Sequence, residues 1–313
     1  MQTILGSNGV IGMELAQILP HYTEEPVRLV SRHPKHATGN EELLEADLLD
    51  PEATDRAVAG STIVYVTVGL QYDTKIWQKQ WPVLMQNIIN SCERHGARLV
   101  FFDNVYMYGM VDGEMTEETP VNPTSLKGEV RARIATMLME AVHAKRIEAL
   151  IARSADFYGP GADKTFAKPM IFDAFRKGKR AAWLIDAHQP HSMTYTKDAA
   201  RGLAVLGNSD DTMNQIWHLP TSYERITGEQ FIEKVASAYG VKPRYSVLAP
   251  WMLTVAGWFD LLARETREMA YQFDRPYQFA SRKFTQRFFE ATPYEEAIAQ
   301  TVAEERHIKN ESI

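Results

Sequence analysis

The chain has 313 residues, of which 45% are hydrophobic and 24% are charged, and this composition is sufficient for one large core or two smaller ones. Its formal net charge of −6 offers no attraction to nucleic acid or to an anionic membrane, so neither is expected as a partner. The single cysteine, Cys92, excludes an internal disulfide and fits a reducing compartment. No secretory signal precedes the first predicted strand, and the cytoplasm is the expected location.

Short apolar runs alternate with amphipathic stretches in the first half of the chain. The apolar runs predict strands at residues 3–5, 27–30, 43–46, 62–68, 98–102 and 149–153, and the amphipathic stretches predict helices at 10–19, 77–95 and 124–145. Strands that alternate with helices of this length form right-handed crossover units. The sequence therefore predicts an α/β fold with a Rossmann-type, doubly wound parallel sheet.

The alternation changes after about residue 155. Residues 158–161 form a predicted turn, and helices are predicted at 166–176, from about 196, and at 228–239. We expect one domain from residues 1–155 with a return at about 191–218, and a smaller, helix-rich part from residues 156–190 and 219–313. The apolar stretch 247–263 in that part is too short for a membrane span and predicts a core or pocket-lining helix.

Three glycines follow the first predicted strand and open the first predicted helix. Gly6 permits a tight turn, Gly9 lets the backbone approach a pyrophosphate, and Gly12 lets the helix pack on the strand. The N–H groups at the start of this helix attract phosphate. The pattern predicts a dinucleotide site formed by Gly6, Asn8, Gly9, Val10, Ile11 and Gly12. The alternative is an ordinary turn, which would not require a strand before the glycines and a helix after them.

The end of the second predicted strand indicates which dinucleotide binds. An acidic residue there would bind the ribose hydroxyl of NAD, but the chain has Ser31, Arg32 and Lys35 and no carboxylate until Glu41. Arginine is suited to forked recognition of phosphate. NADP is therefore favoured over NAD, and the alternative is that Arg32 only stacks on the adenine.

The order of the remaining motifs resembles the extended short-chain dehydrogenase/reductase family, the NAD-dependent epimerase/dehydratase group, over nearly the whole chain. The matching stretches are Ala46 to Asp50, Thr67 to Gly69, Tyr108-Gly109, Arg153 to Gly161 and Met193 to Ala200. The resemblance implies that the first domain binds NAD(P) and that the second part binds the substrate. It also implies cofactor contacts from Asp47, Leu48, Thr67, Val68, Gly69 and Phe157.

Two catalytic positions of that family carry other residues in this chain. Asn104 occupies the position of the catalytic Ser or Thr, and the family's Tyr-x-x-x-Lys becomes Lys127-x-x-x-Arg131. None of the 13 tyrosines is followed four residues later by lysine, so the motif has not moved elsewhere. The resemblance therefore implies an atypical member with altered proton-transfer chemistry.

The replacements keep groups that could serve a reaction. Residues 127 and 131 share one helix face, so Lys127 could act as a general acid while Arg131 binds ribose hydroxyls. Repulsion by Arg131 would favour release of the Lys127 proton, and Asn104 could donate an amide N–H to a developing oxyanion. The alternative is a solvated helix face shared with Glu129 and Arg133.

Aromatic residues and one histidine are the candidate substrate contacts. We expect Tyr72, Tyr106, Tyr158 and His191 to line the substrate site, with the tyrosines and Tyr108 as rival proton donors. No metal ligands are expected.

Two functions are compatible with these residues. The first is an NAD(P)-dependent oxidoreductase or epimerase/dehydratase-like enzyme that acts on a small carbonyl or hydroxyl compound. The second is a catalytically inactive, NADP-binding sensor of the same fold. In the family that this chain resembles, the helix pair predicted here at 77–95 and 124–145 forms a dimer interface, so a homodimer is expected through Ile134, Met137, Leu138 and Ala141. The alternative is that these four side chains only cover the sheet.

Overall fold

The computed structural model describes residues 1–310, which form two compact units. The first unit comprises residues 1–109, 120–154 and 199–219, and the second comprises residues 110–119, 155–198 and those from 220 onward. None of the described helices is long and apolar enough to cross a membrane.

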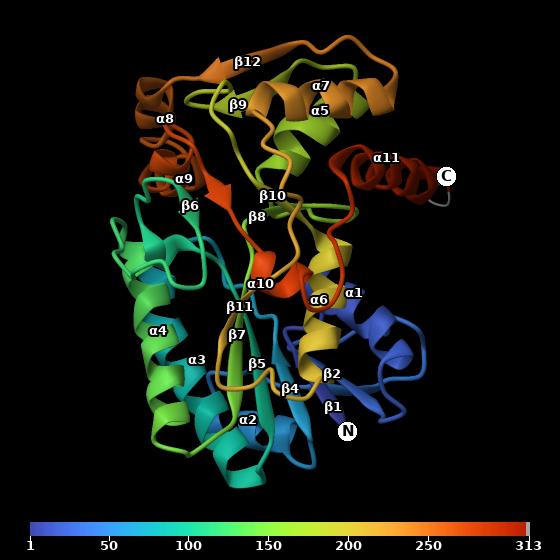
Figure 1. Cartoon of the computed structure of the whole chain (residues 1–313), viewed down its shortest axis with the longest axis vertical. Helices are drawn as coiled ribbons and strands as arrows, with labels where there is room; N and C mark the ends of the chain where they lie inside the picture. The colour runs from blue at the N-terminus through green and yellow to red at the C-terminus, as the bar shows by residue number, and fades with distance from the viewer. Residues whose placement is uncertain (311–313) are drawn as a thin grey trace. The chain divides into compact units, whose positions relative to one another are not determined.

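A seven-stranded sheet forms the centre of the first unit (Figure 1). Its strands are β1 (Gln2–Leu5), β2 (Val27–Ser31), β3 (Glu42–Glu45), β4 (Ile63–Val66), β5 (Arg98–Asp103), β7 (Ala149–Arg153) and β11 (Ile216–His218). The order is β11-β7-β5-β4-β1-β2-β3, and every neighbouring pair is parallel. The predicted Rossmann-type parallel sheet is confirmed.

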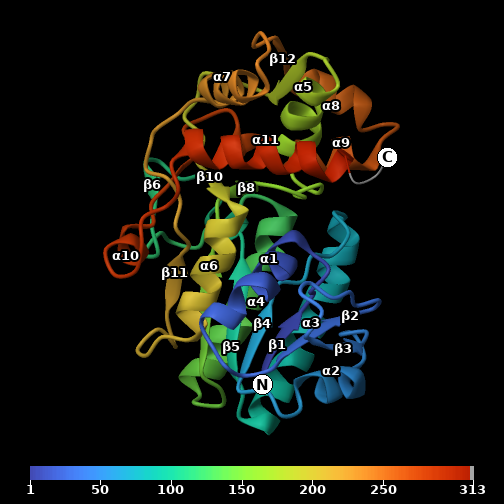
Figure 2. The same ribbon diagram turned by 90° about the vertical axis from the view of Figure 1, so that its right-hand side faces the viewer.

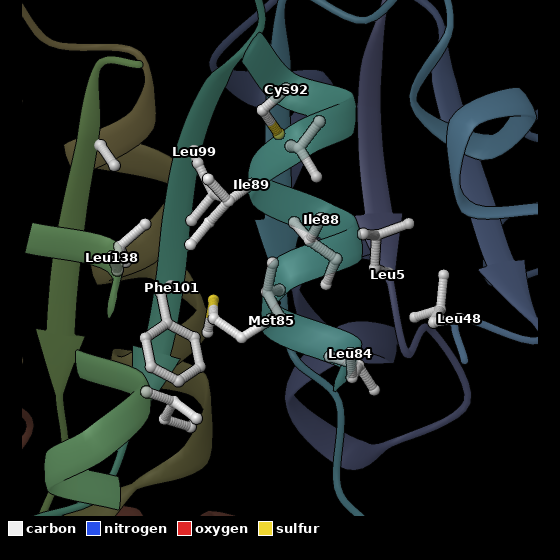
Figure 3. Packing of buried hydrophobic residues seen from close by; sticks show 14 of the residues in the cluster. Leu5, Leu48, Leu84, Met85, Ile88, Ile89, Cys92, Leu99, Phe101 and Leu138 are labelled. Atoms are coloured by element: carbon white, nitrogen blue, oxygen red, sulfur yellow. The ribbon is translucent and has the colours of Figure 1, made fainter. Parts of the chain in front are cut away.

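Helices cover both faces of this sheet. They are α1 (Val10–Ile18), α2 (Pro51–Val58), α3 (Thr74–His95), α4 (Leu126–His143) and α6 (Thr196–Gly207). The two ribbon views place α2, α3 and α4 on one face and α1 and α6 on the other (Figures 1 and 2). Apolar side chains of α3, α4 and the strands interlock between the first group and the sheet, as the close view of Leu84, Ile88 and Phe101 shows (Figure 3).

The apolar residues of α4 are used within this core. Ile134, Leu138 and Ala141 are buried and Met137 is partly buried against them, so they cover the sheet as the alternative interpretation requires. The exposed positions of α3 and α4 are mostly polar, such as Lys79 and Glu140. Val83 and Leu126 are the half-exposed apolar residues of the pair, and the homodimer stays a prediction.

Element ends differ from the sequence prediction where a side chain caps a helix or a neighbouring strand stops. Helix α3 begins at Thr74 because the Asp73 side chain accepts a hydrogen bond from Ile76 N at 3.0 Å. Strand β4 ends at Val66, which pairs with the last residue of β1, Leu5. Helix α2 was not predicted; its start is capped by Asp50 and carries proline at the first position.

The second unit is built from three two-stranded parallel sheets and short helices. The sheets pair β6 (Glu114–Met115) with β13 (Gln278–Phe279), β8 (Asp156–Tyr158) with β10 (Met193–Tyr195), and β9 (Ala181–Leu184) with β12 (Tyr245–Leu248). Its helices include α5 (Asp173–Arg176), α7 (Gly228–Tyr239), α8 (Pro250–Ala256), α9 (Leu261–Glu268), α10 (Arg282–Thr285) and α11 (Tyr294–Asn310). The predicted helix 166–176 is shorter and begins with a π-helical segment, Lys168–Phe172, before α5. Aromatic residues around Tyr158, Phe231 and Tyr294 form the core.

Candidate active site

The first unit has a topological switch point between β1 and β4. β2 lies on one side of β1 and β4 lies on the other, and Leu5 pairs with both Val30 and Val66. The residues that follow these strands therefore meet at one edge of the sheet. Ligands of open α/β sheets bind at such a point.

The glycine loop has the shape that a pyrophosphate site requires. Gly6 has a φ of +87°, and a Cβ built on it would lie 2.7 Å from Val68 Cα. A Cβ on Gly12 would lie 2.8 Å from Ser7 Cα, whereas one on Gly9 would meet nothing closer than 3.5 Å. No side chain caps the start of α1 and its first turn has no acidic residue, so the helix N-terminus suits an anion. These residues fit a dinucleotide phosphate.

The loop after β2 lies against the glycine loop. Asn8 Nδ2 donates a 2.7 Å hydrogen bond to the His33 carbonyl oxygen, and Ser31 Oγ accepts one from His33 N at 3.2 Å. The side chains of Arg32 and Lys35 are exposed at this position. The loop therefore presents two cations next to the proposed phosphate site.

The other predicted cofactor residues of the first unit follow β3 and β4. Asp47 is exposed, and its Oδ1 accepts from Leu49 N at 3.0 Å, while Leu48 is buried. Thr67 Oγ1 donates to the Leu5 carbonyl oxygen at 3.1 Å, which ties β4 to β1. Val68 is partly buried and Gly69 is exposed.

The start of α4 brings Lys127 to the loop that follows β5. Ser125 caps the helix, because its Oγ accepts from Gly128 N at 3.0 Å. A Cβ built on Gly128 would lie 2.6 Å from the Tyr106 carbonyl oxygen, so only glycine permits this approach of helix and loop. On the loop, Asn104 Oδ1 accepts from Tyr106 N at 3.1 Å. Asn104 and Gly128, the residue after Lys127, therefore both approach the Tyr106 backbone.

Lys127 is completely buried, which contradicts the solvated-face alternative. Its Nζ donates to Thr74 Oγ1 at 2.9 Å and lies 4.7 Å from the centre of the Tyr72 ring. Tyr72 packs edge-to-face on Trp77, and Tyr106 stacks on the same indole. Two predicted substrate residues thus pack on Trp77 in the first unit, and one of them, Tyr72, lies beside the ammonium.

Arg131 is also buried, and it forms an ion pair that the sequence did not reveal. Its Nε donates to Asp103 Oδ1 at 2.7 Å, and its second guanidinium contact is to the same oxygen. The guanidinium carbon lies 4.5 Å from the Trp81 ring centre and 5.0 Å from that of Phe101. Asp103 compensates the charge of Arg131, so the repulsion that Lys127 experiences is weaker than two bare cations would produce.

A second arginine approaches the same carboxylate. Arg153 Nε lies 3.7 Å from Asp103 Oδ2, and Arg153 NH1 donates to the Tyr108 hydroxyl at 2.7 Å. The Tyr108 hydroxyl also forms a 2.9 Å hydrogen bond with His218 Nε2. The buried network therefore runs from Arg131 to His218 and joins α4, β5, β7 and β11.

Three predicted site residues belong to the second unit. Phe157 and Tyr158 lie on β8. Tyr158 is buried among aromatic rings, and burial raises the pKa of its hydroxyl well above the usual value, which makes it a poor proton donor. His191 is stacked between Phe273 and Tyr277, and its Nε2 donates to Asp156 Oδ2 at 2.9 Å.

Sequence reasoning missed Asp103, Arg153 and Thr74 as parts of this site. Asp103 precedes Asn104 in the sequence, and Arg153 begins the motif that ends at Gly161, so both residues adjoin or belong to motifs that the sequence shows. Their signal is a charged residue at the end of an apolar strand, where the side chain needs a buried partner. Thr74 gave no signal. Among the described residues no cluster of His, Cys, Asp and Glu could hold a metal ion.

Comparison with known proteins gives a family and several structural relatives. The NAD dependent epimerase/dehydratase family matches residues 3–219. A search of curated proteins finds no match.

Solved structures of similar fold cover nearly the whole chain. A protein called gox2253 is 21% identical with a TM-score of 0.81, and the alignment covers 98% of each chain. The UDP-glucose 4-epimerase of Thermus thermophilus, in complex with NAD, is 18% identical with a TM-score of 0.78, covering 98% of this chain and 99% of that one. A double mutant of the dTDP-glucose 4,6-dehydratase DesIV from Streptomyces venezuelae, with NAD bound, is 15% identical with a TM-score of 0.79, covering 99% and 98%. At these identities the likeness establishes the fold alone.

Proposed function

The chain belongs to the NAD dependent epimerase/dehydratase family, and we propose that it is an NADP-dependent oxidoreductase or epimerase that acts on a small carbonyl or hydroxyl compound. The observation that carries this proposal is the position of Lys127. A completely buried ammonium is expensive to desolvate, and the order of motifs in the sequence aligns this one with the catalytic tyrosine of the family.

The cofactor supplies hydride transfer when it is bound. The glycine loop and the start of α1 hold its pyrophosphate, with Asp47 and Thr67 to Gly69 along the remaining edge. Arg32 and Lys35 bind the 2′-phosphate of NADP, because both are exposed beside Ser31. The carboxylate of Glu45, which lies opposite Ser31 on β3, is 4.0 Å from His33 Nδ1. Two relatives named above carry NAD in their structures, and the two cations after β2 are the reason to propose NADP for this chain.

Lys127 is the proton donor in this proposal. Thr74 Oγ1 fixes the ammonium and Tyr72 covers it, so the proton lies at a defined position beside the start of α4. Asn104 donates its amide N–H to the reacting oxygen, since its Oδ1 is already occupied by Tyr106 N. Arg131 acts through Asp103 and the aromatic rings as a positioning residue, because its guanidinium is buried in that pair.

The second unit favours a substrate without a diphosphate. A pocket of this unit is lined by Glu114, His191, Arg225 and Arg282 among others. Glu114 accepts hydrogen bonds from Arg282 at 2.7 Å and from Arg225 at 2.9 Å, and these bonds lower its pKa. His191 is bound by Asp156. Arg225 and Arg282 therefore already share a carboxylate partner, which a diphosphate would have to displace.

The inactive sensor remains the second candidate, and a specific observation favours it. The nitrogen of Lys127 is bound to Thr74 in a completely buried environment, and Arg131 is occupied by Asp103. A purely structural role would also produce these contacts. Turnover separates the two functions, because a sensor binds NADPH tightly without oxidising it.

The test is steady-state oxidation of NADPH across a panel of small aldehydes and ketones, for the wild type and Lys127→Ala. We expect the variant to lose about two orders of magnitude in kcat, the usual contribution of a positioned general acid, with an unchanged Kd for NADPH. Arg133→Ala, which removes an exposed cation from the same helix, is the matched control and should keep wild-type kcat.

Two results would contradict the proposal. Wild-type turnover in Lys127→Ala would move the proton donor to another residue, with Tyr72 and Tyr106 as the nearest rivals. Tight NADPH binding by the wild type without oxidation of NADPH by any member of the panel would establish the sensor instead.

A further inference from the structure

The loop between β2 and β3 contains a buried carboxylate. The side chain of Glu41 is only 3% exposed, although most of its neighbours in this loop are exposed. Taking an ionised carboxylate out of water is costly unless hydrogen bonds replace the lost solvation. Glu41 therefore needs partners within the loop, and the proposed reaction gives it no role.

Four hydrogen bonds close residues 36–41, which we name the 36–41 loop, around this carboxylate. Oε1 accepts from Thr38 N at 2.6 Å and from Thr38 Oγ1 at 2.9 Å. Oε2 accepts from Gly39 N at 3.0 Å and binds His36 Nδ1 at 3.1 Å. Burial raises the pKa of Glu41, but the hydrogen bonds outweigh burial and lower the pKa to about 2. The ionised carboxylate can only accept, so His36 Nδ1 carries the proton of that bond.

A second contact fixes the chain before the 36–41 loop. Asn8 Nδ2, from the glycine loop, donates to the His33 carbonyl oxygen at 2.7 Å. Pro34 follows, and its ring restricts the backbone there. The segment from His33 to His36 is therefore held at one end by the glycine loop and at the other end by Glu41.

This segment and the residue before it carry the two cations of the proposed 2′-phosphate site. Arg32 and Lys35 are exposed, and among residues 1–310 neither side chain forms an ion pair or a hydrogen bond. The nearby carboxylate of Glu45 is instead 4.0 Å from His33 Nδ1. Ordering flexible cationic side chains on a ligand costs conformational entropy, and a backbone that is already fixed reduces this cost.

We propose, on the basis of the NADP site proposed above, that Glu41 is a positioning residue that sets the preference for NADPH over NADH. Glu41 holds the 36–41 loop, and the loop keeps the backbone of Lys35 and Arg32 in the arrangement that meets the 2′-phosphate. NADH has no 2′-phosphate, so its affinity does not depend on this arrangement.

Fluorescence titration of the full chain with NADPH and with NADH, without substrate, tests this role. We expect Glu41→Ala to raise the Kd for NADPH about tenfold, as for the loss of preorganisation at one or two flexible side chains, and to leave the Kd for NADH unchanged. Gly39→Ala is a second variant that keeps the carboxylate. It strains the loop because residue 39 has a φ of +98°, and it should also reduce the preference for NADPH. The thermal midpoint of each variant shows that it is folded.

The matched control removes a carboxylate at the opposite edge of the same sheet. Glu25 precedes β2, whereas Glu41 follows it, and Glu25 also binds a hydroxyl, that of Thr62, at 2.6 Å. Glu25→Ala should keep the wild-type Kd for both cofactors.

Three results would overturn the inference. A wild type that prefers NADPH, with the same ratio of the two Kd values in Glu41→Ala and Gly39→Ala, would refute the role of Glu41 and leave the 2′-phosphate site standing. An equal loss of affinity for both cofactors in Glu41→Ala would show that Glu41 only stabilises the unit. Equal affinities in the wild type would refute the 2′-phosphate site itself, and the role of Glu41 with it.

Discussion

Replacing Asp103 by asparagine removes one charge from the buried network without changing its shape. The asparagine oxygen can still accept from Asn104 N, which donates to Asp103 Oδ1 at 2.8 Å, so the perturbation is confined to the charge. Asp103 and Arg131 are 0% and 4% exposed, and Arg153 lies 3.7 Å from the second carboxylate oxygen. The variant therefore leaves two buried guanidinium groups without a counter-charge.

The expected cost follows from this burial. Removing one partner of a buried ion pair destabilises a protein by about 3–5 kcal/mol, since the remaining charge is desolvated without compensation. With a urea m-value of about 2 kcal/mol/M, the unfolding midpoint should fall by roughly 1.5–2.5 M. Tryptophan fluorescence is a suited signal, because Trp81 lies against the Arg131 guanidinium.

The matched control is an exposed pair of the same chemistry in the same unit. Arg146 holds Glu93 through its Nε at 2.9 Å and through a second guanidinium nitrogen, but both side chains are 39% exposed. Glu93→Gln should leave the midpoint unchanged, because water screens this pair. If Asp103→Asn shifts the midpoint no more than this control does, the Asp103 network does not stabilise the fold and our reasoning is refuted.

Two further predictions concern the first unit. NADPH should bind more tightly than NADH in a fluorescence titration, and Arg32→Ala should narrow that difference by about 1–3 kcal/mol; equal affinities in the wild type would contradict the 2′-phosphate site. Burial alone would raise the pKa of Glu41, but hydrogen bonds within the 36–41 loop, including those from Thr38, lower it to about 2. The pKa of Glu41 is therefore lower in the folded than in the unfolded chain. Its contribution to the free energy of unfolding is complete above about pH 4.5 and is lost as the pH falls towards 2. Acid titration of stability should show this loss in the wild type and not in Glu41→Gln.

The fold of the first unit was predictable because its information is local. The apolar run before Gly6 and the amphipathic stretch after it are each readable within a few residues, and the strand order follows from right-handed crossovers. The missed features are pairs that are distant in the chain. Asp103 and Arg131 are 28 positions apart, and Lys127 and Thr74 are 53 positions apart. No periodic pattern of residues in the sequence indicates contacts at such separations.

The prediction of a core or pocket-lining helix after residue 247 was wrong for a different reason. In this segment Trp251 is 67% exposed and Phe259 is 89% exposed. Composition indicates that Trp251 and Phe259 prefer burial, but burial depends on whether another surface is available. The second unit fully buries only Leu253 of α8 and Glu265 of α9. A sequence pattern cannot distinguish a side chain buried within the chain from one that a partner would bury.

The replacements at the candidate site form one coupled set. Arg131 lies among Trp81 and Phe101, where a guanidinium without a counter-charge would be costly, so its presence requires Asp103. Asp103 in turn offsets the charge of Arg131, which lies one helical turn from Lys127 on the same face of α4. The electrostatic surroundings of Lys127 therefore depend partly on a residue of β5. The chemistry of Lys127 consequently has to be interpreted together with Asp103 and Arg131, and substitutions at these three positions should not be additive.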